Sequence, residues 1–282
     1  MWPFTRTPLV PVLRLTGPIG MVTPLRPGLS LSTLAGPLEK AFEMSTTPSV
    51  AVIVNSPGGS PVQSSLILKR IRALAEENEK KVHVFCEDVA ASGGYYIALA
   101  GDEIYAEPSS IVGSIGVISS SFGFDKAIAK LGIDRRVYTA GRSKSILDPF
   151  LPEKAEDVER LAAVQRDAHD VFIGVVKERR AGKLKGLDPE LFSGAFWSGK
   201  QALELGLIDG ITDIRTRMRE LYGEKVRLKA VPLDRGGLLS RLKRMPSLAT
   251  AGAIMESGAD AALTDDLVST METRGLWARY GL

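Results

Sequence analysis

One serine stands among unusually small neighbours, in the segment EDVAASGGYYIA at residues 87–98. An apolar run at 82–86 precedes this segment and an apolar, helix-compatible run ends it, which predicts a strand, a tight turn and a buried helix. Ser92 would then begin the helix, where unpaired backbone N–H groups and the helix dipole favour a developing negative charge. Because its neighbours are small, Ser92 is a candidate nucleophile; the alternative is a serine that only caps the helix.

A nucleophilic serine needs a group that removes its proton, and the sequence offers few candidates. His83 lies in the run that leads to Ser92, and His169 lies in a long helical pattern. Neither is in a glycine-rich loop, so we expect structural or solvated roles, and a Ser-His-Asp triad has little support. Lys144 lies among small polar residues in AGRSKSILDPF at 140–150, and burial can lower a lysine pKa enough for base chemistry. On the residues alone, a solvated loop lysine is the simpler interpretation.

Acyl transfer also needs backbone N–H groups that hold a developing oxyanion, and glycines allow a carbonyl to approach them closely. The cluster NSPGG at 55–59 follows a β-branched run, and Gly93 follows Ser92 directly. Loops at the carboxyl ends of neighbouring parallel strands converge on one crevice, so we expect these two glycine loops to meet.

Strands alternate with helices through the first 140 residues, which predicts an α/β fold with a largely parallel sheet. The expected helices span 31–44, 61–78, 124–131 and 153–180. The expected strands span 9–15, 49–54, 82–86, 102–106, a β-rich stretch at 111–119, 136–139 and 226–231.

The composition narrows the class of protein. The 282 residues can bury a substantial core, and a net charge of +3 is too small to indicate nucleic-acid binding. Cys86 is the only cysteine, so an intrachain disulfide is impossible and a buried free thiol is expected.

The two ends of the chain bear on its location. We find no export signal and no run of ~20 apolar residues, so a protein that is cytoplasmic or peripheral to the membrane is expected. Strand signals stop after residue 235, and LLSRLKRM at 238–245 is basic and apolar. We therefore expect a domain at 1–235 and a helical tail at 236–282 that contacts another subunit or a membrane surface.

Four motifs occur in a recognisable order: NSPGG, AASGGYYIA, GSIGV and a G-x-x-K-S loop that ends in Pro-Phe. Together with the later segment FSGAFWSGKQALELGLIDG, they resemble the signal peptide peptidase A family, peptidase family S49. Its members are serine–lysine peptidases of the Clp/crotonase fold, built from repeated β-β-α units. The similarity covers roughly residues 9–231, and it implies a Clp/crotonase-like domain with a mostly parallel sheet.

The resemblance implies roles for individual residues. Ser92 matches the nucleophile and Lys144 the general base. Gly59 and Gly93 would supply the oxyanion N–H groups, with Gly58 supporting the turn, and Ser114 of GSIGV would orient the lysine.

The resemblance also implies partners. Family members form ring-like homo-oligomers in which the lysine can reach the serine of an adjacent subunit, and they need no metal or cofactor. They favour small or apolar residues around the scissile bond, as in signal-peptide remnants. Typical members carry an N-terminal membrane anchor, which we do not find in this sequence.

Two other functions are compatible with this fold. A crotonase-like acyl-CoA enzyme would hold a thioester in the same oxyanion site, but that class uses carboxylates, and only Glu87 and Asp88 lie upstream of the Ser92 turn. A non-catalytic oligomeric scaffold is the other alternative. The presence of nucleophile, base and both glycine loops favours the peptidase.

Overall fold

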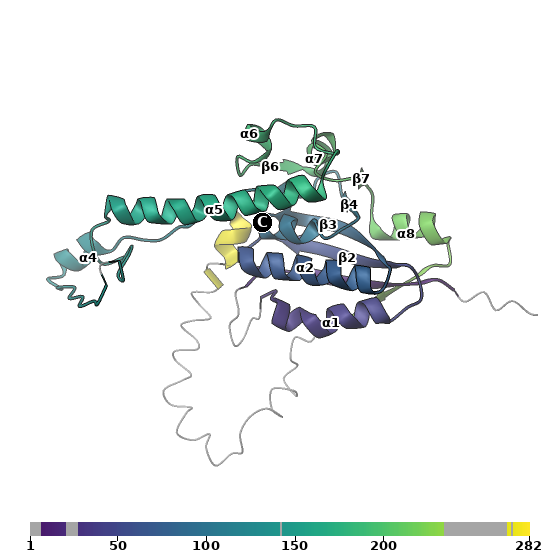
Figure 1. The fold of residues 1–282 in the computed structure, drawn as a ribbon, viewed down its shortest axis with the longest axis horizontal. Helices are drawn as coiled ribbons and strands as arrows, with labels where there is room; N and C mark the ends of the chain where they lie inside the picture. The colour runs from purple at the N-terminus through teal and green to yellow at the C-terminus, as the bar shows by residue number, and fades with distance from the viewer. Residues whose placement is uncertain (1–6, 21–27, 142, 234–269, 272) are drawn as a thin grey trace, which may run out of the picture.

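The computed structural model describes residues 7–20, 28–141, 143–233, 270–271 and 273–282 (Figure 1). A mostly parallel sheet forms the centre, in the order β6-β5-β3-β2-β1-β8, with β4 beside β3 and β7 beside β4. Among the strands of the described residues, only β5 and β6 pair in antiparallel fashion. The strands are β1 Leu9–Thr16, β2 Ser49–Ser56, β3 Lys81–Ala91, β4 Glu103–Ala106, β5 Ile111–Gly113, β6 Phe196–Ser198, β7 Gly210–Ile211 and β8 Arg227–Ala230.

The two largest apolar clusters of the described residues lie on opposite faces of the sheet. All eight residues of β2 are buried, as expected of a parallel strand that is covered on both faces. Val50, Val52 and Val54 belong to the larger core, which α1 (Leu31–Glu43), α2 (Pro61–Glu77) and α3 (Gly93–Ala98) cover. Ala51 and Ile53 belong to the smaller core, which includes Met218 of α8 (Ile214–Tyr222).

The start of α2 follows from its sequence. Ser60 caps the helix by accepting a hydrogen bond from the Gln63 N–H at 3.3 Å, and Pro61 occupies the first turn, where its missing N–H costs nothing. The helix therefore begins directly after the NSPGG loop. The start of α2 therefore fixes where β2 ends relative to the rest of the sheet and its covering helices.

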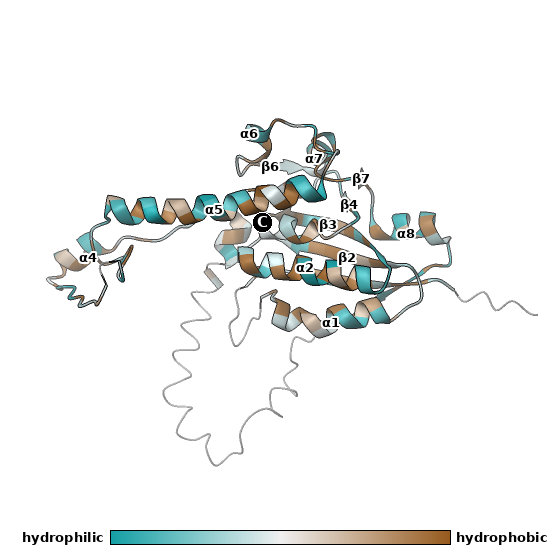
Figure 2. Cartoon of the chain, viewed as in Figure 1, coloured by the Kyte–Doolittle hydropathy of each residue, from teal (hydrophilic) through white to brown (hydrophobic). Residues whose placement is uncertain are grey.

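Residues 117–165 extend from the sheet and its covering helices as an arm (Figure 1). It contains α4 (Asp125–Lys130) and the first part of α5 (Ala155–Arg179). The only buried residues of α5 are Phe172 and Val176, which lie beyond the arm. Brown segments among teal ones in Figure 2 mark apolar residues on the arm. Its exposed large hydrophobic side chains are Ile118, Phe122, Phe124, Leu131, Ile133, Val137, Tyr138, Phe150, Val158 and Val164.

The remaining short helices, α6 (Asp188–Leu191) and α7 (Gly199–Glu204), lie beside β6 (Figure 1). Residues 270–271 and 273–278 are also helical. Residues 279–281 form a turn after this helix, and the other parts of the expected tail, 236–269 (which includes 238–245) and 272, lie outside the described residues. No described helix has the length and apolar character needed to cross a membrane.

The sheet and helices predicted from the sequence are confirmed, with three corrections. The expected strand at 136–139 is wrong: these residues are exposed on the arm and form no strand. The β-rich stretch at 111–119 is a strand only to Gly113, because Gly113 (φ 112°) and Ser114 (φ 53°) turn the chain out of the sheet. The strand expected at 82–86 continues to Ala91.

Candidate active site

Ser92 has a strained backbone and a hydroxyl that caps nothing. Its φ of 52° and ψ of −123° are unusual for any residue with a side chain, and its side chain makes no capping hydrogen bond to α3. The Ser92 N–H donates to the Gly113 carbonyl at 2.8 Å, which ties the turn to β5. The capping interpretation therefore fails. Strain of this kind at a half-buried serine is typical of a functional turn.

The NSPGG loop packs directly against the Ser92 turn. A Cβ placed on Gly58 would lie 2.8 Å from the Ser92 Cβ and 3.0 Å from the Gly93 nitrogen. A Cβ placed on Gly93 would lie 3.3 Å from the Gly59 nitrogen. The predicted meeting of the two glycine loops is confirmed, and glycine is required because the two backbones touch.

The N–H groups of Gly59 and Gly93 remain available. Within the described residues, neither is engaged by another hydrogen bond. The Ile19 segment fixes the loop from the other side: the Ile19 N–H donates to the Gly58 carbonyl at 2.9 Å, and the Ser60 N–H donates to the Ile19 carbonyl at 2.9 Å. Two fixed, unpaired donors beside a serine hydroxyl are the arrangement that stabilises an oxyanion.

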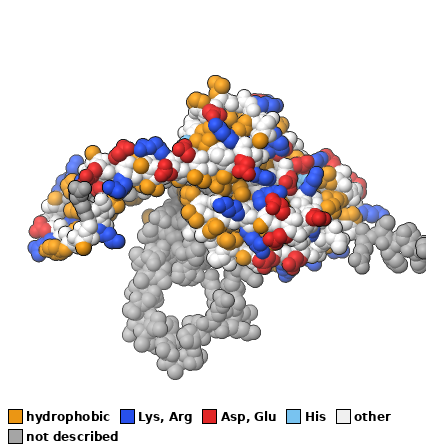
Figure 3. All heavy atoms as spheres, viewed as in Figure 1, with side chains coloured by type: hydrophobic (Ala, Val, Ile, Leu, Met, Phe, Trp, Pro, Cys, Tyr) orange, Lys and Arg blue, Asp and Glu red, His pale blue; other side chains and the backbone are white. Residues whose placement is uncertain are grey.

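A pocket of about 320 Å³ opens beside Ser92. Ser92 and Gly59 both line it, and Lys69 of α2 is the charged residue among its lining. Figure 3 shows hydrophobic side chains gathered where α5 passes α2. The other lining residues are Pro61, Val62, Ser65, Leu66, Gly93, Tyr96, Gly116, Val117, Ala168, Val171 and Phe172. The pocket suits an apolar side chain.

Ser114 also lies near the turn. It follows Gly113, which pairs with Ala91 across β5 and β3, and its own N–H donates to the Ala195 carbonyl at 2.7 Å. Its side chain is buried. The fold thus brings together five of the six site residues predicted from the sequence.

Lys144 is the exception, because it lies on the arm. Its loop is held to α4 and to the start of α5: the Phe124 N–H donates to the Pro149 carbonyl at 2.6 Å, and the Leu147 N–H to the Asp157 carboxylate at 3.5 Å. Lys144 is exposed. Ala168 of α5 lines the pocket, and the thirteen helical steps from Ala155 to Ala168 span roughly 20 Å. Lys144 is therefore remote from the Ser92 of its own chain.

His83 forms a second constellation that resembles a catalytic triad. Its Nε2 lies 3.1 Å from the Ser49 hydroxyl, and its Nδ1 lies 3.0 Å from a Glu103 carboxylate oxygen. Ser49 and His83 are buried, and the Ser49 hydroxyl also contacts the Tyr222 hydroxyl at 2.6 Å. This cluster lies at the opposite end of β3 from Ser92, roughly 20 Å away along the strand. A sealed serine cannot meet a substrate, so the role is structural.

His169 does not contact Ser92. Its Nε2 lies 3.0 Å from the Ile115 carbonyl and joins α5 to the segment after β5. The structural roles expected for both histidines agree with these contacts.

The buried His83 should make stability depend on pH. Burial lowers its pKa below the ordinary 6.5, which outweighs the attraction of Glu103. The unfolded chain then binds a proton that the folded chain does not, so the free energy of unfolding should fall as the pH drops below about 6.5. The slope for one proton is at most about 1.4 kcal/mol per pH unit. Denaturant unfolding from pH 8 to pH 5 should show a smaller decline in His83→Gln than in the wild type, and equal declines would contradict this role.

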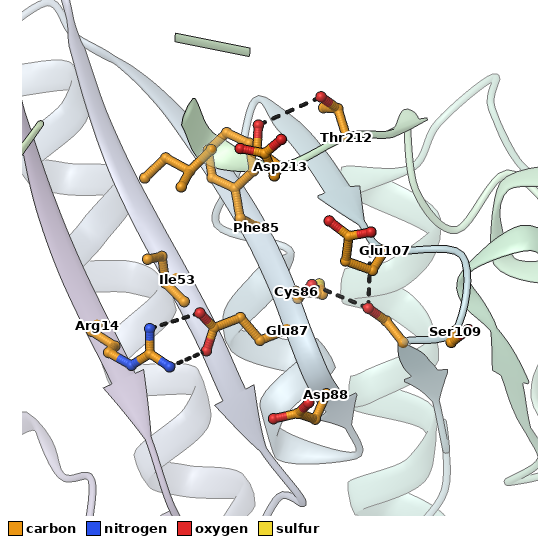
Figure 4. A pocket seen from close by; sticks show the side chains of 12 residues that line it. Arg14, Ile53, Phe85, Cys86, Glu87, Asp88, Glu107, Ser109, Thr212 and Asp213 are labelled. Atoms are coloured by element: carbon orange, nitrogen blue, oxygen red, sulfur yellow. Dashed lines mark hydrogen bonds and ion pairs between the residues drawn. The ribbon is translucent and has the colours of Figure 1, made fainter. Parts of the chain in front are cut away.

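A second pocket, of about 460 Å³, lies on the other face of the sheet (Figure 4). Glu87 points across β2 and pairs with Arg14 through both carboxylate oxygens. Cys86, which lines this pocket, is buried, and burial raises the pKa of its thiol to about 12. The expected buried free thiol is confirmed.

The sequence matches the model of a known protein family. The model described as "Peptidase family S49" matches residues 75–227, more than half of the chain. The chain belongs to peptidase family S49. The matched range includes Ser92, Ser114 and Lys144 of this S49 chain, and the fold is the Clp/crotonase-like α/β fold that the resemblance implied.

Curated proteins with similar sequences include one named as an antiporter and others named as proteases or peptidases. The S49 chain is 58% identical over 97% of its length to the Na(+)/H(+) antiporter NhaA of Brucella abortus, and covers 37% of that protein. It is 30% identical over 95% of its length to the chloroplastic serine protease SPPA of Arabidopsis thaliana, covering 42% of it. It is 32% identical over 67% of its length to a putative signal peptide peptidase SppA of Enterococcus faecium, covering 54%. The chain thus spans about half of these relatives or less.

Two groups of residues at the site could not be predicted from the sequence. The α5 residues that line the pocket fall within the helix predicted at 153–180, but the sequence of a helix does not show which neighbour its apolar residues contact. The sequence also does not show that Asn55 of the NSPGG cluster and Asp88 upstream of the Ser92 turn contact each other, as they do in the structure. No group of three or more His, Cys, Asp or Glu side chains in the described part of the chain is arranged to hold a metal ion.

Proposed function

We propose that this chain is a serine endopeptidase. The observation that carries the proposal is the strained Ser92 with two unpaired N–H groups, of Gly59 and Gly93, held beside it. Ser92 attacks the scissile carbonyl while a lysine amine takes its proton, and the N–H groups bind the oxyanion. The lysine returns the proton to the leaving amine. Water, deprotonated by the same lysine, then hydrolyses the acyl-enzyme, and no metal or cofactor takes part.

The base in this proposal is Lys144 of a neighbouring subunit. Lys144 cannot serve its own chain's Ser92, because its loop is attached to the remote end of α5. The arm exposes many large apolar side chains, which a ring-like homo-oligomer would cover. Ser114, close to Ser92, would orient the incoming amine.

The proposed substrates are peptides with small or apolar residues at the scissile bond, such as signal-peptide remnants. The pocket beside Ser92 supports this class, since its lining is mainly apolar. The relative named as an antiporter matches over one part of its length, which we infer to be a peptidase part of that chain. Peripheral contact with a membrane remains part of the proposal.

The acyl-CoA alternative gains nothing from the geometry. That chemistry would need Glu87 or Asp88 at the oxyanion site. Glu87 instead pairs with Arg14, and Asp88 accepts a hydrogen bond from Asn55 at 2.6 Å.

A fluorophosphonate probe tests the proposed function. The Ser92 oxygen should displace fluoride from phosphorus, and mass spectrometry should locate a single adduct on the peptide that contains Ser92. Ser92→Ala should give no adduct and no hydrolysis of an apolar fluorogenic peptide, whereas Ser49→Ala should retain both. An adduct on Ser49, or peptide hydrolysis by Ser92→Ala, would overturn the proposal.

A further inference from the structure

Strands β2 and β3 change register just before the Ser92 turn. Val54 pairs with Cys86, but the next paired residue of β2, Ser56, faces Ala90. Two steps along β2 therefore correspond to four steps along β3, and β3 bulges at Glu87 and Asp88. A bulge of this kind redirects the chain that follows it, here the chain that leads to Ser92.

The Asn55 side chain spans this bulge. Its Nδ2 donates to the Asp88 carboxylate at 2.6 Å, and its Oδ1 accepts from the Val89 N–H at 3.2 Å. Only one orientation of the amide satisfies both partners, because a carboxylate only accepts and an N–H only donates. Asn55 is 8% exposed and its bond to the Val89 N–H is buried, whereas Asp88 is an exposed residue and its bond to Asn55 is partly buried. The side chain replaces the ladder contact that the bulge removes.

We call Asn55, Asp88 and the two hydrogen bonds of the Asn55 side chain the clamp. The chain that follows the clamp has little conformational freedom. A Cβ placed on Gly94 would lie 2.4 Å from the Ser56 carbonyl oxygen, so the Ser92 turn sits tightly on the end of β2. The Asn55 carbonyl in turn accepts from the Gly17 N–H at 3.0 Å, which anchors Asn55 to the segment after β1. The clamp thus joins the two loops that carry the N–H groups of Gly59 and Gly93.

We propose that Asn55 and Asp88 are positioning residues that set the distance between the two oxyanion donors through the β3 bulge. The inference rests on the proposed function, since it assigns these residues to the chemistry of Ser92. Neither residue touches the reacting atoms. Their effect should therefore appear in the rate of the chemical step and not in binding at the apolar pocket.

A charge swap tests the clamp. At pH 8, Asn55→Asp places two carboxylates against each other, which repel and open the clamp. In the double variant Asn55→Asp with Asp88→Asn, the new amide at position 88 donates to the new carboxylate at position 55, the reverse of the wild-type bond, and that carboxylate still accepts from the Val89 N–H. Glu87→Gln is the matched control, because it removes the neighbouring bulge carboxylate, which pairs with Arg14. For each variant, fluorophosphonate labelling gives the maximal inactivation rate, the inhibitor affinity and the final adduct stoichiometry.

We expect Asn55→Asp to lower the maximal inactivation rate about 10²-fold, with affinity and final stoichiometry unchanged. The maximal inactivation rate of the double variant should recover to within about threefold of the wild-type rate. The rate of Glu87→Gln should equal that of the wild type. If Asn55 had only a structural role, Asn55→Asp would lower the final adduct stoichiometry, because part of the protein would be misfolded. The maximal inactivation rate of the folded molecules would then stay at the wild-type value.

Three results would overturn the clamp: wild-type labelling by Asn55→Asp, loss of stoichiometry alone, or no recovery in the double variant. If Asn55→Asp does not fold, the double variant decides, since it must both fold and label. Failure of the wild type to label would instead overturn the proposed function.

Discussion

Lys144→Ala should lower kcat for an apolar peptide by about 10²–10⁴-fold, the usual contribution of a positioned general base. The neutral amine takes the Ser92 proton in the attack and delivers it to the leaving group, so its loss affects both steps of acylation. KM should change little, because Lys144 does not line the pocket beside Ser92. Steady-state hydrolysis of a fluorogenic peptide measures both quantities.

Lys130→Ala is the matched control for this prediction. Lys130 is an exposed lysine on α4, on the same arm as Lys144. Its removal changes the charge of the arm equally and should leave kcat within about twofold of the wild type, as expected of a surface substitution. Equal losses in the two variants would show that the arm needs positive charge and not a base.

Gly58→Ala should lower kcat by about 10²–10³-fold, comparable to the loss of an oxyanion donor. Gly58 has φ 105°, and an added Cβ would lie 2.8 Å from the Ser92 Cβ, 3.0 Å from the Ala91 carbonyl oxygen and 3.0 Å from the Gly93 nitrogen. The methyl group must therefore push the two loops apart. We also expect a loss of about 1–3 kcal/mol in the free energy of unfolding from the strained φ. Peptide hydrolysis and denaturant unfolding measure the two effects.

Gly174→Ala provides the control for the glycine variant. Gly174 lies in α5, and a Cβ placed there meets no atom within 4 Å. Alanine in a helix should stabilise the chain by up to about 1 kcal/mol and leave kcat unchanged. A Gly58→Ala enzyme with wild-type kcat would mean that the two loops need not touch for activity.

The sequence was sufficient to predict the parts of the site that follow from local patterns. NSPGG and ASGG each follow a β-branched or apolar run, and parallel strands bring such loops to one edge of a sheet. This reasoning placed Gly58, Gly59, Ser92 and Gly93 together. The strained φ of Ser92 could not be predicted, because it arises from contacts with Gly58 and Gly113 that are distant in sequence.

The parts that failed depend on tertiary contacts. The residues at 136–139 have strand-like composition, but no strand in the part of the chain that the structure describes pairs with them. Sequence reasoning ended β3 at Cys86, because the charged residues Glu87 and Asp88 interrupt the apolar run. The bulge accommodates both charges, one facing Arg14 and one facing Asn55, so the strand continues to Ala91. The long helix predicted at 153–180 is confirmed as α5. Its exposure on the arm could not be predicted, because it depends on which faces of the helix pack against the rest of the protein.

The most direct test of a site shared between subunits is to mix two inactive variants. Ser92→Ala supplies an intact Lys144, and Lys144→Ala supplies an intact Ser92. If the lysine of one chain serves the serine of the next, equal mixing with subunit exchange should restore about a quarter of wild-type activity, because each site draws its two residues independently. Mixed oligomers that stay inactive, although subunit exchange is verified by mass spectrometry, would contradict the proposal that Lys144 acts across the subunit interface.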